Sequence, residues 1–217
     1  MKQETLDYFK TVQTGVVTDA MYLLGLKGWT TDIFPLRPEA RVFGRAFTLQ
    51  AVPLSSKEQP SYTIYDMKEH WKEGDVLVID GMGLKLSMMG ENMAHYCMYG
   101  GLAGVVMYGR CRDYGQIRDL EMPVFGMGPA MELKNGHFKY GAYNVPVNLG
   151  GALVNPGDYI LGDIDGVLVI PANHLEAVKY QAEMIQEAEE EMERAIRAGA
   201  GAREIQAIAA KKKTARA

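Results

Sequence analysis

The spacing of apolar positions changes repeatedly along the chain, and each change predicts a different element. Short apolar or alternating runs, bounded by glycine or proline, are typical of strands. They cover 41–52, 75–80, 102–108, 123–126, 145–149 and 159–170, the last as a strand pair. Elsewhere apolar residues keep the three-to-four-residue spacing of amphipathic helices, over 4–24, 61–71, 90–99 and 173–198. Strands that alternate with helices predict an α/β fold.

The helix predicted over 173–198 is the longest. Asn173 and Glu176 have the spacing of a capping box at its start. Its apolar stripe is formed by Leu175, Val178, Ala182, Ile185, Met192 and Ile196. Glu189 falls on that stripe or at its edge in water, and isolated buried charge is costly. A striped helix near the end of a compact domain favours packing against another subunit.

The composition is that of a globular protein, with 217 residues, 47% hydrophobic and 23% charged. We expect one domain over 1–200, including the 173–198 helix, and a short helical, basic tail over 201–217. The net charge of −4 gives no reason to expect nucleic-acid binding. No run approaches the ~18 apolar residues of a membrane span, and the first residues lack an apolar signal core. Two cysteines without a CxxC pair suit reduced thiols, so we expect a cytoplasmic protein.

The stretch from Gly90 to Gln116 carries the candidate chemistry. Gly90 and Glu91 open a helix, Gly100-Gly101 ends it, and a short strand follows that leads into Arg112-Asp113. Ligands of open α/β sheets bind outside the carboxyl ends of strands. The helix start and the strand exit are therefore expected to meet at one site.

The residue types at this junction suit a 2-oxo acid. Arg112 offers a planar fork that grips a carboxylate, and Asp113 is a hard oxygen ligand for Mg²⁺ or Mn²⁺. The helix start at Gly90 offers the backbone amides of Asn92 and Met93. Glu91 would stand beside them as an acid or base.

Other interpretations of the same residues stay open. Asp113 and Gln116 also have capping-box spacing, which would make Asp113 the cap of a helix that starts there. Glu91 and His95 are four residues apart on a helix, which suits either a metal pair or a solvated face. A Schiff-base aldolase needs a buried lysine, and the only lysine nearby in the sequence is Lys85.

Several sequence blocks together resemble the 4-hydroxy-4-methyl-2-oxoglutarate aldolase family, which also contains the ribonuclease regulator RraA. The central one is the glycine and acidic residue at 90–91 followed by Arg112-Asp113. The others are the segments 18–20 (TDA), 44–48 (GRAFT), 74–80 (GDVLVID), 155–158 (NPGD) and 162–167 (GDIDGV). The resemblance implies a three-layer β/β/α sandwich of the swivelling-domain type. It also implies a homo-oligomer, either a trimer or a hexamer of two trimers.

The resemblance assigns roles to matching residues. Asp113 would hold Mg²⁺ or Mn²⁺, Arg112 would bind the pyruvyl moiety, and Glu91 would shape the site and relay protons. An acidic side chain from a neighbouring subunit's C-terminal helix would complete the site. It maps onto 187–191, and we choose Glu189 from its position on the stripe.

The reaction that the resemblance implies is a metal-dependent, class II aldol cleavage. A 4-hydroxy-2-oxo acid would give pyruvate and a second carbonyl product, and oxaloacetate decarboxylation would pass through the same enolate. The alternative is an RraA-like protein that binds and regulates a ribonuclease or another partner, with a vestigial site. Two positions depart from the family pattern. Gln116 stands where an acid is usual, and Tyr108 stands where aspartate is common. These departures affect which substrate the site accepts and how strongly it binds the metal.

Overall fold

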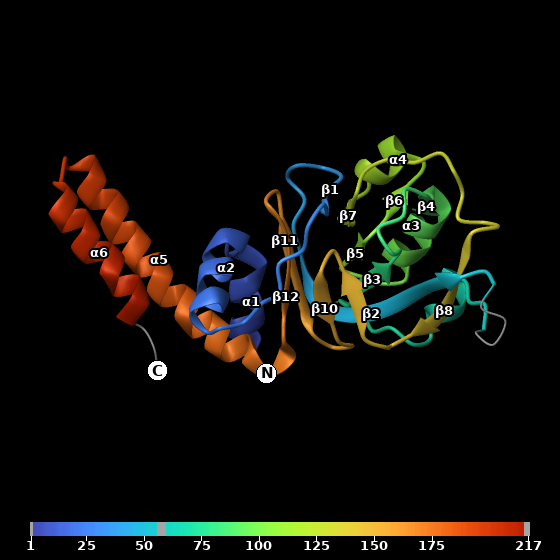
Figure 1. Cartoon of the computed structure of the whole chain (residues 1–217), viewed down its shortest axis with the longest axis horizontal. Coiled ribbons are helices and arrows are strands. Elements are labelled where there is room, and N and C mark those ends of the chain that lie inside the picture. Colours follow the sequence, from blue (N-terminus) through green and yellow to red (C-terminus); the bar gives the residue numbers. More distant parts are fainter. Residues whose placement is uncertain (1, 56–59, 215–217) are drawn as a thin grey trace. The chain divides into compact units, whose positions relative to one another are not determined.

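A computed structural model describes residues 2–55 and 60–214 of the chain (Figure 1). The chain divides into two compact units: Gly28–Ala172, and a helical unit formed by Met1–Lys27 with Asn173–Ala217. We describe each unit by itself. The expected boundary between a domain and a tail at residue 200 stays a prediction, and the last three residues of that tail lie outside the described residues.

The first unit is built on an eight-stranded mixed sheet with the order β1-β7-β5-β3-β2-β11-β12, in which β8 also pairs with β2. The strands are β1 (Phe34–Pro35), β2 (Val42–Pro53), β3 (Val76–Asp80), β5 (Gly104–Met107), β7 (Val124–Gly126), β8 (Phe138–Tyr143), β11 (Tyr159–Asp163) and β12 (Gly166–Ile170). Strands β2, β3, β5 and β7 run parallel to one another. Their carboxyl ends therefore lie along one edge of the sheet.

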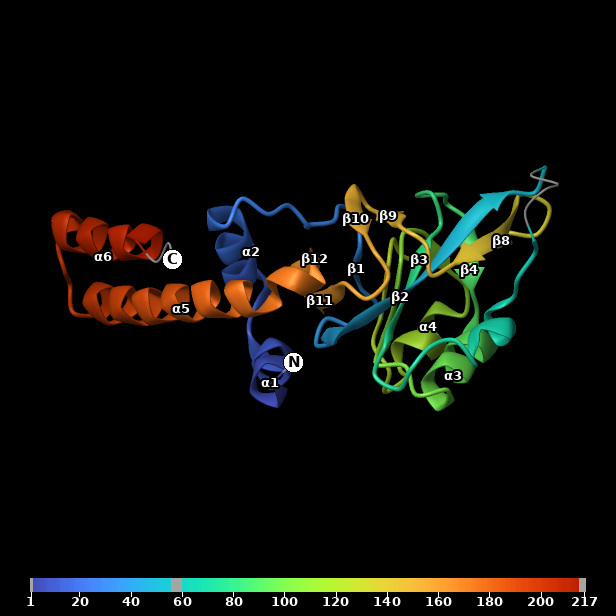
Figure 2. The ribbon, with the colours of Figure 1, turned by 90° about the horizontal axis from the view of Figure 1, so that it is seen from below.

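Different layers cover the two faces of this sheet, as Figure 2 shows. One face is covered by helix α3 (Glu91–Tyr99), the 3₁₀ turn η1 (Ile64–Met67) and helix α4 (Tyr114–Arg118). The apolar side chains buried there form a first hydrophobic core. The hairpin of β9 (Val147–Leu149) and β10 (Ala152–Val154) buries the second core against the other. The predicted three-layer β/β/α arrangement is confirmed.

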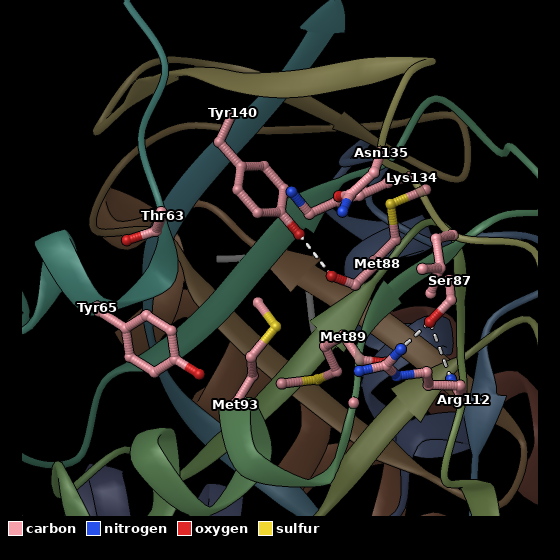
Figure 3. A pocket seen from close by; sticks show the side chains of 12 residues that line it. Thr63, Tyr65, Ser87, Met88, Met89, Met93, Arg112, Lys134, Asn135 and Tyr140 are labelled. Atoms are coloured by element: carbon pink, nitrogen blue, oxygen red, sulfur yellow. Dashed lines mark hydrogen bonds between the residues drawn. The ribbon is translucent and has the colours of Figure 1, made fainter.

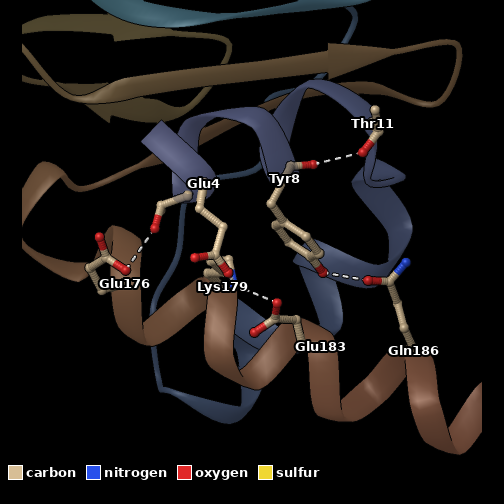
Figure 4. Close-up of polar contacts among 8 residues, drawn as sticks. Glu4, Tyr8, Thr11, Glu176, Lys179, Glu183 and Gln186 are labelled. Carbon is tan, nitrogen blue, oxygen red and sulfur yellow. Dashed lines mark hydrogen bonds and ion pairs between the residues drawn. The ribbon is translucent and has the colours of Figure 1, made fainter. Parts of the chain in front are cut away.

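The helical unit contains α1 (Gln3–Thr11), α2 (Thr14–Leu23), α5 (Leu175–Arg197) and α6 (Ala202–Thr214). Helix α5 packs on α1, α2 and α6, and the first four stripe residues, from Leu175 to Ile185, are buried. Figure 4 shows polar contacts between α1 and α5, including the bond from the Tyr8 hydroxyl to Gln186 Oε1 at 2.5 Å. The first half of the stripe thus finds its partner within the chain. Ile196, further along, is 57% exposed.

Most predicted strands and the long helix are confirmed, and three local predictions are wrong. Residues 61–71 form only the η1 turn, because packing of Ile64 and Met67 in the core overrides the helical spacing. The helix over 4–24 divides, because Val12 adopts an extended backbone. Asn173 does not cap α5, which starts after His174, and Glu176 instead accepts a bond from Thr5. No helix in the described residues is long and apolar enough to cross a membrane.

Candidate active site

A two-stranded parallel ladder lies beyond the carboxyl end of β5 and brings the candidate residues together. It pairs β4 (Ser87–Met89) with β6 (Arg110–Cys111). The backbone N–H of Arg112 lies between the Ser87 Oγ, at 3.0 Å, and the Met89 carbonyl, at 3.1 Å. Because β4 leads into α3 and β6 leads into Arg112-Asp113, the helix start and the strand exit meet as predicted.

The Asp113 side chain bonds to the start of α3 and not to α4, the helix that follows Asp113 in the chain. Its Oδ2 accepts a bond from the backbone N–H of Glu91, at 3.0 Å, which caps the start of α3. It precedes α4 directly, yet its side chain makes no bond to that helix, and Gln116 is exposed. The capping-box interpretation of Asp113 and Gln116 is therefore wrong. Asp113 also has a φ of 54°, a left-handed conformation that is unusual for residues other than glycine.

Gly90 leaves the space that this arrangement needs. A Cβ atom at this position would lie 2.7 Å from Asp113 Oδ2 and 2.9 Å from Arg112 Nε. The Arg112 Nε in turn lies 3.5 Å from Asp113 Oδ2. Only a residue without a side chain lets both groups approach the helix start, so the glycine follows from packing rather than from backbone strain.

The first turn of α3 has fewer free backbone N–H groups than the sequence predicted. The Met93 N–H donates to the Gly90 carbonyl, at 3.1 Å, and the Glu91 N–H donates to Asp113. The prediction of a free amide at Met93 is therefore wrong, because the turn closes on Gly90. Within 2–55 and 60–214, the Asn92 N–H is the first-turn amide without a protein partner. It is the one left for a substrate oxygen.

Glu91 and His95 lie on an accessible face of α3. The Glu91 Oε1 lies 3.5 Å from His95 Nε2, and the His95 ring stacks on Tyr99. In the described residues no group of three or more histidine, cysteine or acidic side chains could hold a metal. The His95 Nδ1 is buried without a hydrogen-bond partner there.

A cavity of about 240 Å³ opens beside the Arg112 guanidinium (Figure 3). Its predicted members are Gly90, Met93 and Arg112, while Glu91, Asn92 and Asp113 do not line it. The other lining residues are Thr63, Tyr65, Ser87, Met88, Met89, Leu133, Lys134, Asn135 and Tyr140. Three methionines, two tyrosines and a leucine make the lining largely apolar around the two cations, Arg112 and Lys134.

Lys134 is a cation of this cavity that sequence reasoning missed. It lies in an irregular segment before β8, where nothing in the pattern distinguishes it from a solvated lysine. Burial lowers its pKa. Its Nζ lies 4.6 Å from the centroid of the Tyr140 ring, and it has no carboxylate partner in the described part of the chain. The lysine nearest the site is therefore Lys134 and not Lys85, which is exposed.

The wall opposite Arg112 is held by two tyrosine hydrogen bonds, one of them buried. The hydroxyl of Tyr140, which is fully buried, donates to the Met88 carbonyl, at 2.8 Å. Burial raises the pKa of Tyr140, so it remains a neutral donor. The Tyr96 hydroxyl donates to the Tyr65 carbonyl, at 3.1 Å, which fixes the segment around Tyr65 to α3. The cavity shape is thus set by residues outside the predicted site.

The donor set at Asp113 fits a hydrated hard cation. One carboxylate oxygen bonds the Glu91 N–H, which leaves Oδ1 without a hydrogen bond in the described residues. Mg²⁺ commonly keeps several waters and binds through one or two carboxylates together with substrate oxygens. Mn²⁺ accepts the same ligands. A single carboxylate beside a substrate cavity suits such an ion and does not suit an all-protein cage.

Glu189 lies in the helical unit. Its Oε1 pairs with Lys212 Nζ on α6, at 2.6 Å, and that amine also lies 4.0 Å from Asp19 Oδ2. The side chain of Glu189 is 41% exposed, so it stands at the edge of the stripe. Its role at a neighbouring subunit's site stays a prediction.

Comparison with known proteins identifies the family. The sequence profile of the RraA-like family, described as "Aldolase/RraA", matches residues 14–169. The chain belongs to the RraA-like family. A relative from Halalkalibacterium halodurans, named "Putative 4-hydroxy-4-methyl-2-oxoglutarate aldolase", is 34% identical over 202 residues, which is 90% of this chain and 91% of the relative. Protein DlpA of Legionella pneumophila is 31% identical over 84% of this chain, but the match spans only 30% of DlpA.

Solved structures of the family share the fold. An uncharacterized protein from Pseudomonas syringae pv. tomato has a TM-score of 0.82 at 25% identity, covering 95% of this chain and 98% of its own. Streptomyces coelicolor RraAS2, described as an unusual member of the RNase ES inhibitor RraA protein family, has a TM-score of 0.80 at 28% identity. That match covers 89% of this chain and 98% of RraAS2. RraA-like proteins thus carry both aldolase and regulator names.

Proposed function

We propose that this RraA-like chain is a divalent-metal-dependent carbon–carbon lyase. Its substrate would be a 4-hydroxy-2-oxo acid with a second carboxylate, such as 4-hydroxy-4-methyl-2-oxoglutarate. The observation that carries the proposal is the pair of cations, Arg112 and Lys134, in one largely apolar cavity beside Asp113. A regulator that binds only through its surface has no need of this arrangement.

Two anchors set the orientation of the substrate. The Arg112 fork would take the C1 carboxylate, and the Asn92 N–H at the positive end of α3 would support it. Lys134 would take the distal carboxylate, because a half-buried cation without a carboxylate partner in the described residues is stabilised by an anion. Met93 and Tyr65 would pack against the carbons between the two anchors.

The bond-breaking step needs a base and an electron sink. Glu91 would accept the proton of the 4-hydroxyl, the C3–C4 bond would break, and its electron pair would remain on the pyruvyl fragment as the enolate. The second carbonyl product would leave, and a proton delivered to C3 would give pyruvate. A divalent cation at Asp113, Mg²⁺ or Mn²⁺, would supply Lewis-acid stabilisation of the developing charge.

Decarboxylation of oxaloacetate would use the same anchors. Arg112 would hold C1, and loss of carbon dioxide from C4 would leave the same enolate. We therefore propose oxaloacetate decarboxylation as a second activity. The proposed assembly is a trimer or a hexamer, in which a neighbour's Glu189 could exchange its bond with Lys212 for a place at this site.

The test is pyruvate release from both acids with Mg²⁺, with Mn²⁺ and with a chelator. Asp113→Ala should abolish the metal-dependent release, and Asp119→Ala is the matched control, because Asp119 is an exposed acid at the carboxyl end of α4 paired with Arg118. No release by the wild type, together with no binding of pyruvate or oxalate in a metal titration, would overturn the proposal. That outcome would favour a partner-binding role like the one in the description of RraAS2.

A further inference from the structure

A second cavity, of about 350 Å³, lies at the opposite edge of the parallel strands. Its lining includes Arg45 and Ala46, where the parallel pairing of β2 with β3 begins, and Asp75, which directly precedes β3. Active sites of open α/β sheets lie at the carboxyl ends of strands, so this cavity is separate from the candidate active site. The proposed lyase reaction uses none of its residues.

Basic side chains dominate its rim. Arg45, His70 and Lys72 converge on it, against the single carboxylate of Asp75. The Asp75 Oδ2 already accepts the backbone N–H of Lys72, at 2.8 Å. In the described ranges, neither Arg45 nor Lys72 has an ion-pair partner. Two cations are thus left to face the cavity.

A stacked ring holds His70 in place, and a glycine turn leaves room for Arg45. The His70 ring stacks on Tyr143, with centroids 4.8 Å apart, and its Nε2 lies 3.3 Å from the Tyr143 hydroxyl. A Cβ at Gly157 would lie 3.1 Å from an Arg45 guanidinium nitrogen, and Gly157 has a φ of +87°. The glycine turn therefore leaves room for the guanidinium beside it. The floor is the buried pair Ala46 and Phe47.

We propose that this cavity binds a phosphate group, either as inorganic phosphate or as a phosphate monoester. A planar guanidinium fork suits phosphate oxygens, and a neighbouring ammonium and imidazole can satisfy the remaining ones. A dianion also balances the two unpaired cations better than a single carboxylate does. The cavity exceeds the volume of inorganic phosphate, which leaves room for the organic part of a monoester.

The test is an NMR titration of the full-length protein at constant ionic strength, with inorganic phosphate in one arm and glycerol 3-phosphate in the other. We expect saturable shifts of the amides around 45–47, 70–75 and 156–157. Arg45→Gln should weaken binding about tenfold, with Arg45→Lys intermediate and Lys72→Gln weakening it several-fold. The arm with the tighter binding identifies the form of phosphate that the cavity takes.

Two controls make the outcome decisive. Lys85→Gln removes an exposed lysine elsewhere and should leave binding unchanged, as should Arg112→Gln in the candidate active site. If neither ligand gives saturable shifts, or if Arg112→Gln abolishes them while Arg45→Gln does not, the proposal is overturned. If Arg45→Gln does not fold, Lys72→Gln decides, because the Lys72 side chain is exposed.

Discussion

The two ends of the parallel strands carry two different kinds of cationic cavity. At the carboxyl ends, Arg112 and Lys134 stand among methionine and tyrosine side chains, with Asp113 bonded to the start of α3. At the amino ends, Arg45, His70 and Lys72 surround a more polar space. Positively charged side chains therefore lie in apolar surroundings at one end of the strands and in polar surroundings at the other.

The difference lies in what each environment does to a charge. Burial among apolar groups lowers the pKa of Lys134 and strengthens any ion pair that it forms with a substrate. Exposed cations are screened by water and salt, so each contributes little alone and binding depends on several together. The first cavity suits chemistry on a bound anion, and the second suits reversible binding.

The largest effect is expected from Asp113→Asn. Asparagine tolerates the left-handed backbone and can still accept the Glu91 N–H, but it removes the charge. Metal-dependent pyruvate release should fall on the order of 10²–10³-fold, as for loss of an electrostatic group at a reacting centre. Steady-state assays with Mn²⁺ check this. Unchanged turnover would show that Asp113 does not take part in the reaction. The cavity beside it would then have no chemical role that distinguishes it from the second cavity.

The next effect is that of Gly90→Ala. The new Cβ would displace Asp113 and Arg112 from the helix start, and turnover should fall about 100-fold, since small misplacements of reacting groups are costly. Gly115→Ala is the control, because a Cβ there meets nothing within 4 Å and a helical alanine is favoured by about 0.5–1 kcal/mol. Turnover and thermal unfolding are measured for both. Equal turnover in the two variants would show that the close approach at Gly90 is unimportant.

A smaller and substrate-selective effect is expected from Lys134→Met. Loss of the second anchor should raise the KM for a dicarboxylate about 10- to 100-fold, while pyruvate binding changes little. Comparison of KM values for diacid and monoacid substrates tests this. An equal loss for both kinds of substrate would show that Lys134 does not bind the distal carboxylate.

The pH dependence follows from the same residue. Burial lowers the pKa of Lys134 below its ordinary value of 10.5, so its charge is lost before that of a free lysine as pH rises. The KM for a dicarboxylate should therefore climb on the alkaline side below pH 10.5, and Lys134→Arg should flatten that rise. The charged form also disfavours folding, and this penalty, present at lower pH, fades as pH rises through the folded-state pKa. A KM that is flat across this range would contradict the assignment.

The smallest effect is expected from His95→Leu. The imidazole lies 3.5 Å from Glu91 on an accessible face, so its loss should slow turnover by no more than about fivefold. Exchange of pyruvate methyl protons for deuterium, followed by NMR, isolates the proton-transfer step. His95→Gln should restore part of the rate if a donor beside Glu91 is what matters. A larger loss of pyruvate binding than of exchange would show that His95 has only a structural role.

Much of the fold could be predicted because its signals are local. Apolar runs between glycines marked β3 and β5, and Gly100-Gly101 marked the end of α3. The meeting of Gly90 with Arg112-Asp113 followed from one short helix-to-strand connection. These features depend on neighbours in the sequence, which periodicity and turn chemistry report.

Other features depend on contacts between distant segments, and the sequence missed them. Lys134 and Tyr140 reach the cavity from the segment 127–144, where the sequence pattern predicted no element and the structure forms β8. Asp113 had capping-box spacing for α4, but the αL backbone turns its carboxylate to α3. Periodicity contains no information about such tertiary choices.

The central claim is that the cavity beside Asp113 is the active site. The most direct measurement is a crystal structure of the chain with oxalate, a mimic of the pyruvate enolate, and Mn²⁺ located by its anomalous signal. We expect Mn²⁺ at Asp113, with the oxalate between it and the Arg112 guanidinium. Oxalate and metal at another place, or a cavity that stays empty at saturating concentrations of both, would contradict it.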